Sequence, residues 1–255
     1  MKTVTFITAC WKRPEILAVY EQAMHRFIQQ SKYKCFTAYV ISPNEDNDWL
    51  KIAETVSRDY SYQYYFSNSP LSHKWNFLLE KAMDEIDSDY YVIMGSDDIH
   101  SLDAWKHYEL IIDNEYDYGG HNSLIFHDVI SGEAVKYKSE VKIAGCGTIL
   151  SKRLVKECFP LWPDNTDKGL DVPRDRKIHS FGYKLFVFND AYCLIDLKSD
   201  TNINGFERFK RKQHITLMNN YRKPNQTLIE NLIPELEFKM INELKRTKRK
   251  NLNRD

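Results

Sequence analysis

The stretch Tyr90-Tyr91-Val92-Ile93-Met94-Gly95-Ser96-Asp97-Asp98 decides how this chain is interpreted. Its apolar run predicts a buried parallel strand, which the Gly-Ser pair ends. In an open α/β sheet, ligands bind beyond the carboxyl ends of the strands. Adjacent carboxylates at that edge repel each other and lose hydration, unless a hard cation such as Mg²⁺ or Mn²⁺ lies between them and a phosphate. The alternative is a solvated turn, because Asp and Ser are common turn residues.

Apolar runs alternate with helical periodicities through the first hundred residues. Pro14 stands where a first helical turn would begin, and apolar residues at helical spacing follow it. Strict alternation of strand and helix predicts parallel strands joined by right-handed crossovers, and therefore an α/β fold with helices on both faces of the sheet. The expected strands are 4–8, 36–41, 62–66 and 90–94, and the expected helices are 14–28, 49–56 and 71–86.

The pattern is less regular after Ser101. The expected elements are helices at 102–112, 151–158 and 171–179, a hairpin of 123–127 with 133–138, a strand at 184–188, and one long polar helix from Gln226. The sequence shows no clear interdomain linker. We therefore expect two halves, 1–100 and 101–204, that share one sheet, followed by an extension over 205–255.

Composition places limits on the class of protein. The chain has 255 residues, of which 42% are hydrophobic and 28% charged, and this balance is typical of a globular protein. Its five cysteines are odd in number, widely spaced and without a CxxC pair, which argues against a zinc site or a disulfide framework. We also see no signal peptide and no apolar stretch of transmembrane length. These features favour a cytoplasmic protein.

The loop after the first strand, Thr8-Ala9-Cys10-Trp11-Lys12-Arg13-Pro14-Glu15, leads into a helix N-terminus. Backbone N–H groups and the helix dipole favour an anion there, and Lys12 and Arg13 add positive charge. Trp11 can stack on a base. Neither GxGxxG nor GxxxxGK[ST] is present, so the sequence indicates neither a Rossmann dinucleotide site nor a P-loop.

A second polar segment opens the helix before the acidic strand. Lys74 and Asn76 fall in the first turns of that helix, where they can reach a diphosphate or a sugar. The alternative is a capped surface helix, with Ser69 as the cap and Pro70 at the first position.

Together, three segments resemble the GT-A glycosyltransferases, especially the family 2-like group. Residues 8–14 look like that family's Pro-Thr-Tyr-Asn-Arg-Pro loop, His73-Lys74-Trp75-Asn76 is similar to its Ala-Arg-Asn helix, and Gly95-Ser96-Asp97-Asp98 occupies the place of its Asp-x-Asp motif. The resemblance covers residues 3–100 well and extends weakly to about 200. It implies a GT-A-like fold, with a nucleotide-sugar-binding half at 1–100 and an acceptor-binding half at 101–204.

The resemblance also implies roles for individual residues. Asp98 is expected to bind the metal directly, and Asp97 to bind the metal or the donor ribose. The turn after the second strand departs from the family's Asp-Asp-Gly-Ser, so either Asn44 or Asp46 would contact the nucleotide. The full set of expected donor contacts is Thr8, Ala9, Cys10, Trp11, Arg13, Asn44, Lys74, Asn76, Ser96, Asp97 and Lys198.

Two later segments carry less distinctive signals. Residues 169–175 look like the family's base-bearing segment, with Asp171 as the first candidate for the general base and Asp175 as the second; the alternative for both is an acid that stabilises a helix N-terminus. Residues 196–202 follow a late strand, and they either return Lys198 to the diphosphate or form a surface loop. Gly145-Cys146-Gly147 would lie near the sugar or acceptor, or form a plain turn.

The predicted activity follows from these parts. A divalent cation, Mn²⁺ or Mg²⁺, and nearby cations would stabilise the charge that forms on the departing diphosphate, so no covalent chemistry by the protein is needed. We therefore expect an inverting, metal-dependent glycosyltransferase that uses a nucleoside-diphosphate sugar, with UDP as the expected nucleotide. A nucleotidyltransferase also pairs acids with metal, but it would normally bring a third acid and a Gly-Ser phosphate loop, neither of which we identify in the sequence.

The C-terminal segment differs from the rest in charge. From Gly205 onward there are thirteen Lys or Arg and six Asp or Glu, a net charge of +7, so residues 1–204 carry −7. Basic clusters mixed with aromatic residues fit a phosphate backbone. In this respect the chain resembles the phage enzymes that glycosylate hydroxymethyl pyrimidines, which implies such a base in DNA as the acceptor and the host cytoplasm as the location if a phage encodes the protein. The alternatives are a solvated helix end, a surface or lipid-linked glycan as the acceptor, and a non-catalytic polyanion-binding protein on the same scaffold.

Overall fold

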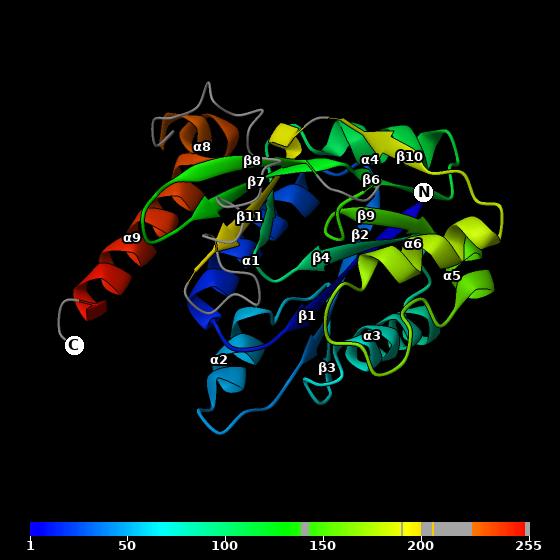
Figure 1. Ribbon diagram of the computed structural model, residues 1–255, viewed down its shortest axis with the longest axis horizontal. Helices are drawn as coiled ribbons and strands as arrows, with labels where there is room; N and C mark the ends of the chain where they lie inside the picture. Colours follow the sequence, from blue (N-terminus) through cyan, green and yellow to red (C-terminus); the bar gives the residue numbers. More distant parts are fainter. Residues whose placement is uncertain (139–142, 190, 200–205, 207–225, 253–255) are drawn as a thin grey trace.

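Four parallel strands form the framework of the computed structural model, which describes residues 1–138, 143–189, 191–199, 206 and 226–252 (Figure 1). Their order across the sheet is β3-β2-β1-β4. Their bounds are Thr3–Cys10 for β1, Lys34–Ile41 for β2, Ser61–Tyr65 for β3 and Tyr90–Gly95 for β4. All four were predicted from their apolar runs, and their carboxyl ends meet at one edge of the sheet.

Three further strands extend this sheet to seven. β9 (Thr148–Ser151) pairs antiparallel with both β4 and β6 (Tyr118–His121), and β10 (Phe186–Phe188) pairs parallel with β6. Neither β6 nor β9 was predicted. Both are only four residues long, and β6 contains two glycines, so neither carries the alternation from which a strand is identified.

Strands from residues 1–100 and from residues 101–204 thus share the seven-stranded sheet, and a second sheet of four strands, which was not predicted, lies at the carboxyl edge of β4. Its order is β5-β11-β7-β8, with bounds Asp98–His100, Leu194–Lys198, Ser123–Asp128 and Ala134–Lys138. The chain leaves β4 at Gly95 and turns through Ser96 and Asp97. It then enters β5, which pairs antiparallel with β11. Asp98 therefore begins a strand instead of ending a turn.

The two faces of the main sheet feed separate apolar clusters. Along β4, Val92 and Met94 face one cluster while Tyr91 and Ile93 face the other, as the two-residue period of a strand requires. Helices α1, α2 and α4 and the small sheet cover the first face, whereas α3, α5 and α6 lie together on the second (Figure 1). The bounds are Pro14–Gln29 for α1, Asp48–Thr55 for α2, Leu71–Glu85 for α3, Trp105–Asp113 for α4, Lys152–Cys158 for α5 and Asp171–Ser180 for α6.

The C-terminal segment forms two helices instead of the one that was predicted. α8 (Gln226–Leu232) and α9 (Glu235–Leu252) meet at Pro234, which has no N–H with which to continue a helix. α9 packs on α1, where Arg26 donates from Nε to buried Glu237 at 2.7 Å. None of the helices in the described part of the chain has the length and apolar character that a bilayer crossing requires.

Candidate active site

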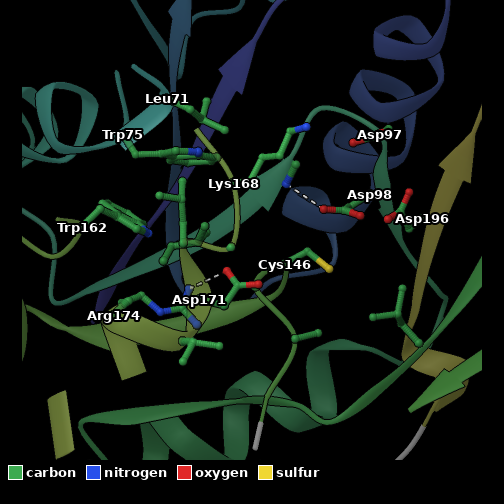
Figure 2. A pocket seen from close by; sticks show the side chains of 18 of the residues that line it. Leu71, Trp75, Asp97, Asp98, Cys146, Trp162, Lys168, Asp171, Arg174 and Asp196 are labelled. Atoms are coloured by element: carbon green, nitrogen blue, oxygen red, sulfur yellow. Dashed lines mark hydrogen bonds and ion pairs between the residues drawn. The ribbon is translucent and has the colours of Figure 1, made fainter. Parts of the chain in front are cut away.

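Three aspartates meet where the two sheets join. Asp97 lies between β4 and β5, Asp98 begins β5, and Asp196 lies opposite Asp98 in β11. One oxygen from each carboxylate lies within 4.8 Å of the others (Figure 2). The sequence analysis named Asp97 and Asp98 as metal ligands and missed Asp196. It placed residues 196–202 after a late strand, whereas Asp196 is inside β11, and only strand pairing brings it opposite the doublet.

The cluster suits a hard divalent cation. Each carboxylate has one oxygen occupied: Asp97 accepts from Arg13 at 2.8 Å, Asp98 from the Gly95 amide at 2.7 Å and Asp196 from Lys198 at 2.6 Å. Oδ1 of Asp196 is buried and has no hydrogen-bond partner among the described residues. Oxygen atoms grouped in this way are the ligands that Mg²⁺ and Mn²⁺ prefer.

Electrostatics in the cluster favour a bound cation. Burial raises the pKa of Asp98 well above its usual range, and the neighbouring carboxylates of Asp196 and Asp97 raise it further. Burial likewise raises the pKa of Asp196 to about 6, although Lys198 opposes the shift. Three carboxylates held this close therefore repel one another, and positive charge between them removes that repulsion.

Gly95 makes room for the cluster. A Cβ at this position would come within 2.5 Å of Oδ2 of Asp98 and 3.0 Å of Oδ1 of Asp97. The glycine that the sequence analysis interpreted as a strand ending is therefore also required sterically, because any side chain here would displace both carboxylates.

Two cavities open on either side of the aspartates and share part of their lining, so that they form one cleft. One cavity, which Asp171 lines, has a volume of about 440 Å³. The other, which Trp11 lines, has a volume of about 450 Å³. Walls common to both include Asp97, Lys168 and Lys198. We refer to the cavities, after the roles that the sequence analysis expects, as the acceptor-side cavity and the donor-side cavity. The cluster and Lys198 thus lie between two ligand-sized spaces.

Most of the expected donor contacts line the donor-side cavity: Ala9, Trp11, Arg13, Lys74, Ser96, Asp97 and Lys198. Lys198 is buried in β11, so the surface-loop alternative for this residue was wrong. Lys74 is also buried and donates to the Cys10 carbonyl at 2.7 Å and to Oδ1 of Asn68 at 3.1 Å. Burial lowers the pKa of Lys74 to about 8. Lys74, which was predicted to lie at the start of α3, is therefore held in the lining of the cavity by a hydrogen bond to the loop after β1.

Three expected donor contacts are corrected by the structure. The Thr8 hydroxyl is buried and hydrogen-bonded to the Tyr20 hydroxyl at 2.7 Å, and the Cys10 side chain lies in the core. The Asn76 amide donates to the Trp162 carbonyl at 2.9 Å and accepts from the Trp162 N–H at 3.2 Å. All three side chains are committed to the fold. Strand alternation turns Thr8 and Cys10 toward the α1 face, and Asn76 holds the loop after α5.

Asn44, the other candidate nucleotide contact, lies just beyond β2 and outside the lining of both cavities. Both polar atoms of its amide are buried and have no hydrogen-bond partner among the described residues. Asp46, its alternative, is exposed and lies 3.9 Å from Lys12.

Asp171 and Asp175 have different surroundings, although both lie on α6. Asp171 lines the acceptor-side cavity with 42% of its side chain exposed (Figure 2). Burial in the cleft raises its pKa, and Asp175 adds to the shift while Arg174 opposes it. Asp175 is buried behind it, where it accepts from Arg174 at 2.9 Å and from the Tyr118 hydroxyl. Of these two candidates for a general base, only Asp171 lines the cavity.

Several lining residues were not assigned a role from the sequence. Trp75 and Trp162 lie on the wall opposite the aspartates, with ring centroids 5.6 Å apart, and Lys168 reaches into the space between them and the cluster (Figure 2). Lys168 belongs to the loop before α6, and this loop is tied to the start of α3: Asp167 accepts from the Leu71 N–H at 2.7 Å, and the Thr166 carbonyl accepts from the Ser72 N–H at 2.9 Å. The loop carried no sequence motif that could have indicated its place.

No family model matches the sequence, and no curated protein matches it. Solved structures are similar in fold. The mannosyltransferase PcManGT from Pyrobaculum calidifontis, in complex with GDP-Man and Mn²⁺, aligns with a TM-score of 0.52 and 14% identity over 81% of this chain and 59% of that one. S. aureus TarS aligns with a TM-score of 0.53 and 13% identity over 78% of this chain and 37% of that one.

A third similar structure is 4-diphosphocytidyl-2C-methyl-D-erythritol synthase, with a TM-score of 0.50 and 14% identity over 74% of this chain and 89% of that one. At these identities the likeness shows the fold alone. The fold is GT-A-like: a mixed α/β structure with a largely parallel sheet flanked by helices, as the sequence predicted.

Proposed function

We propose that this chain is a metal-dependent glycosyltransferase that moves a sugar from a nucleoside-diphosphate sugar to an acceptor hydroxyl. The observation that carries the proposal is the cluster of Asp97, Asp98 and Asp196 at the carboxyl edge of a parallel strand, between two cavities and beside buried lysines. Enzymes that expel a diphosphate need positive charge beside the departing phosphate, and they need no covalent bond between the protein and the substrate. The solved complex of a similar fold with GDP-Man and Mn²⁺ supports the assignment.

The donor would occupy the cavity beside Trp11. The Trp11 ring, 38% exposed, offers a stacking surface for a base, while Arg13, Lys74 and Lys198 supply charge for the diphosphate. Mn²⁺ or Mg²⁺, bound by the three aspartates, would neutralise part of the negative charge on the diphosphate. We propose UDP as the nucleotide, and the free Asn44 amide is the candidate for its recognition.

The acceptor would enter the cavity that Asp171 lines. In an inverting transfer, Asp171 removes the proton of the acceptor hydroxyl as that oxygen bonds to the anomeric carbon of the sugar. The bond from that carbon to the diphosphate oxygen breaks in the same step, and its electron pair leaves with the diphosphate. Lys198 and Lys74 stabilise the charge that this oxygen acquires.

We propose a hydroxymethyl pyrimidine in DNA as the acceptor, on the strength of the +7 charge of residues 205–255. Most of the cations that carry this charge, including the cluster at 208–212, lie outside the residues that the structure describes. A surface or lipid-linked glycan is the alternative acceptor. All five cysteines are present as thiols, which supports the proposal of a reducing cytoplasm.

A nucleotidyltransferase is the competing enzyme class. The third acid that the sequence analysis did not find is now present as Asp196, and one of the similar folds is a cytidylyl-type synthase by its name, 4-diphosphocytidyl-2C-methyl-D-erythritol synthase. The loop after β1 has no glycine, however, and it carries the bulky Trp11 where a backbone phosphate cradle would need small residues.

One screen separates these functions. The purified chain is incubated with a panel of sugar nucleotides and Mn²⁺, and the release of nucleoside diphosphate is followed with and without hydroxymethylated duplex DNA. We expect Mn²⁺-dependent release of UDP from one donor, stimulated by the modified DNA. Release of pyrophosphate from nucleoside triphosphates would instead favour the nucleotidyltransferase. Binding of DNA with no turnover of any donor would leave only the non-catalytic polyanion-binding protein.

A further inference from the structure

Arg174 is one of the most deeply buried charged side chains in the described part of the protein, with 1% of its surface exposed. It lies on α6, one turn after Asp171. Its Nε and Nη2 both donate to Oδ1 of Asp175, at 3.1 and 2.9 Å. The Tyr118 hydroxyl, from β6 of the main sheet, donates to the same carboxylate oxygen. A buried guanidinium is costly unless it is paired and fixed in this way, so the arrangement specifies one orientation of Arg174.

That orientation directs the remaining nitrogen at Asp171. Nη1 of Arg174 lies 4.0 Å from Oδ1 of Asp171, and a dashed line marks this pair in Figure 2. The chain Tyr118–Asp175–Arg174 therefore connects the main sheet to Asp171, the one of the two α6 aspartates that lines the acceptor-side cavity.

Gly145 also lies against this carboxylate. A Cβ on Gly145 would lie 2.3 Å from Oδ1 of Asp171 and 2.7 Å from its Cγ. The backbone of Gly145 is not in the left-handed region, so its lack of a side chain is explained by space and not by conformation. The Asp171 carboxylate is thus bounded by a fixed cation and by backbone that carries no side chain.

We propose that Arg174, anchored by Asp175 and Tyr118, is a positioning residue that orients Asp171 and keeps it ionised for removal of the acceptor proton. This inference rests on the proposed function, and it assigns Asp175 to support of the base instead of to catalysis. Arg174 borders the same cavity, but only 1% of its surface is exposed, so it would act on the substrate through Asp171.

The charges around Asp171 agree with this role. Within α6, Arg174 lowers its pKa and Asp175 raises it, whereas burial is the largest influence and also raises it. Cys146, from the loop before β9, lines the same cavity, and burial raises the pKa of its thiol. The other charged groups that line the same cavity are Asp167, Lys168, Asp97, Asp98, Asp196 and Lys198. Arg174 is the only cation paired with Asp171 among the residues that the structure describes.

The test compares Arg174→Met and Arg174→Lys with the wild type. Hydrolysis of the preferred sugar nucleotide is measured from pH 5 to pH 9, with water as the acceptor. We expect the acidic limb of kcat/KM to move up by about one pH unit in Arg174→Met, so that the loss approaches about tenfold at pH values below both limbs and disappears at pH values well above them. Arg174→Lys should recover most of the loss, because it retains the charge. Arg176→Met is the matched control, because Arg176 is exposed on the same helix.

Two further variants separate ionisation from orientation. Tyr118→Phe removes only the hydroxyl that holds Asp175, and it should move the acidic limb in the same direction by a smaller amount. Gly145→Ala should lower kcat at every pH and leave the limb in place, because it displaces Asp171 without changing its charged partner. Circular dichroism and thermal melting establish which variants fold.

A second readout does not depend on turnover. The carboxyl carbon of Asp171 is titrated by NMR in ¹³C-aspartate-labelled protein, and its resonance is assigned from its absence in Asp171→Asn. Loss of Arg174, or of the Tyr118 hydroxyl if Arg174→Met does not fold, should raise the Asp171 pKa. An unchanged titration and an unchanged limb would overturn the inference. If the wild type turns over no donor, the proposed function fails, and the NMR titration still decides whether Arg174 controls Asp171.

Discussion

At one end of the cleft, three aspartates from two sheets share a small volume, and each has one oxygen fixed by a strand amide or a cation. At the other end, Asp171 stands at the start of α6 with a single charged partner. The first end is suited to holding a multivalent cation, because its carboxylates cannot all keep their charge without one. The second suits proton transfer, because a lone, half-exposed carboxylate can bind and release a proton. An aspartate side chain is thus suited to metal binding where other carboxylates lie close to it, and to proton transfer where it lies outside such a group of carboxylates.

Asp98→Asn tests the first end and should have the largest effect. Removing one charge and one ligand oxygen from the cluster should reduce Mn²⁺-dependent turnover by about 10³-fold, in line with the contribution of groups that stabilise a leaving group. Calorimetry with UDP and Mn²⁺ should show that metal-dependent binding is lost as well.

Asp103→Asn is the control for this experiment, because Asp103 is an exposed acid that lines neither cavity. Asp196→Asn should behave like Asp98→Asn. Full activity of the Asp196 variant would show that β11 contributes no ligand.

Asp171→Asn tests the second end. Loss of a general base should lower kcat by about 10²-fold or more, while the fold and the metal cluster stay intact. Binding of UDP with Mn²⁺, measured by calorimetry, should equal that of the wild type. A parallel loss of donor affinity would mean that the two ends do not act separately, and the comparison would fail.

Glu21→Gln alters a buried carboxyl that belongs to neither end. Burial raises the pKa of Glu21 from 4.5 to about 7, although its hydrogen bond from the Tyr39 hydroxyl opposes the shift. The folded protein therefore holds a proton on Glu21 between these pH values that the unfolded chain has released. The free energy of unfolding should fall as pH rises through this window, by roughly 3 kcal/mol, and level off above pH 7.

Glu21→Gln should remove that slope, because a neutral amide can accept the Tyr39 hydrogen bond at every pH. The measurement is urea denaturation of both proteins at pH 5 and pH 8. Equal slopes with pH would show that Glu21 is not the cause. Mn²⁺-dependent turnover should be unchanged, which separates buried acids of the fold from acids of the cleft.

Trp11→Ala should have the smallest effect. Loss of a stacking surface costs about 1–3 kcal/mol per base, so we expect about a tenfold weaker affinity for UDP and little change in kcat. Trp49→Ala is the comparison variant, since Trp49 packs against Tyr65 away from both cavities. An unchanged affinity for UDP in Trp11→Ala would show that the base does not stack on Trp11.

The sequence predicted the part of the cleft formed by residues 3–100 better than the part formed by later segments, and the reason lies in how each part is built. Residues 3–100 consist of successive strands and helices, each of which can be identified from its own hydrophobic periodicity. The order of these elements then predicts the sheet edge at which Arg13, Lys74 and Asp98 lie. Thr8, Cys10 and Asn76 were misplaced because a motif identifies a loop or a helix but does not say which side chains face the ligand.

The acceptor side depends on contacts between distant segments. β6 and β9 are too short to be identified alone, and the loop carrying Lys168 is held by hydrogen bonds to the start of α3, nearly a hundred residues away. No local pattern encodes such contacts, and Trp162 and Lys168 were accordingly missed.

By itself, the order of apolar runs and turns determined the parallel sheet and the exit of an acidic doublet from its edge, because backbone hydrogen bonding and burial act over a few residues at a time. Only the tertiary structure decided that Asp196 joins the doublet, that Asp175 is buried beside Arg174, and that Asp171 is the one of the two α6 aspartates that lines the cavity. Each of these outcomes depends on the pairing or packing of segments that are far apart in the chain. Such segments come together only when the chain between them has folded.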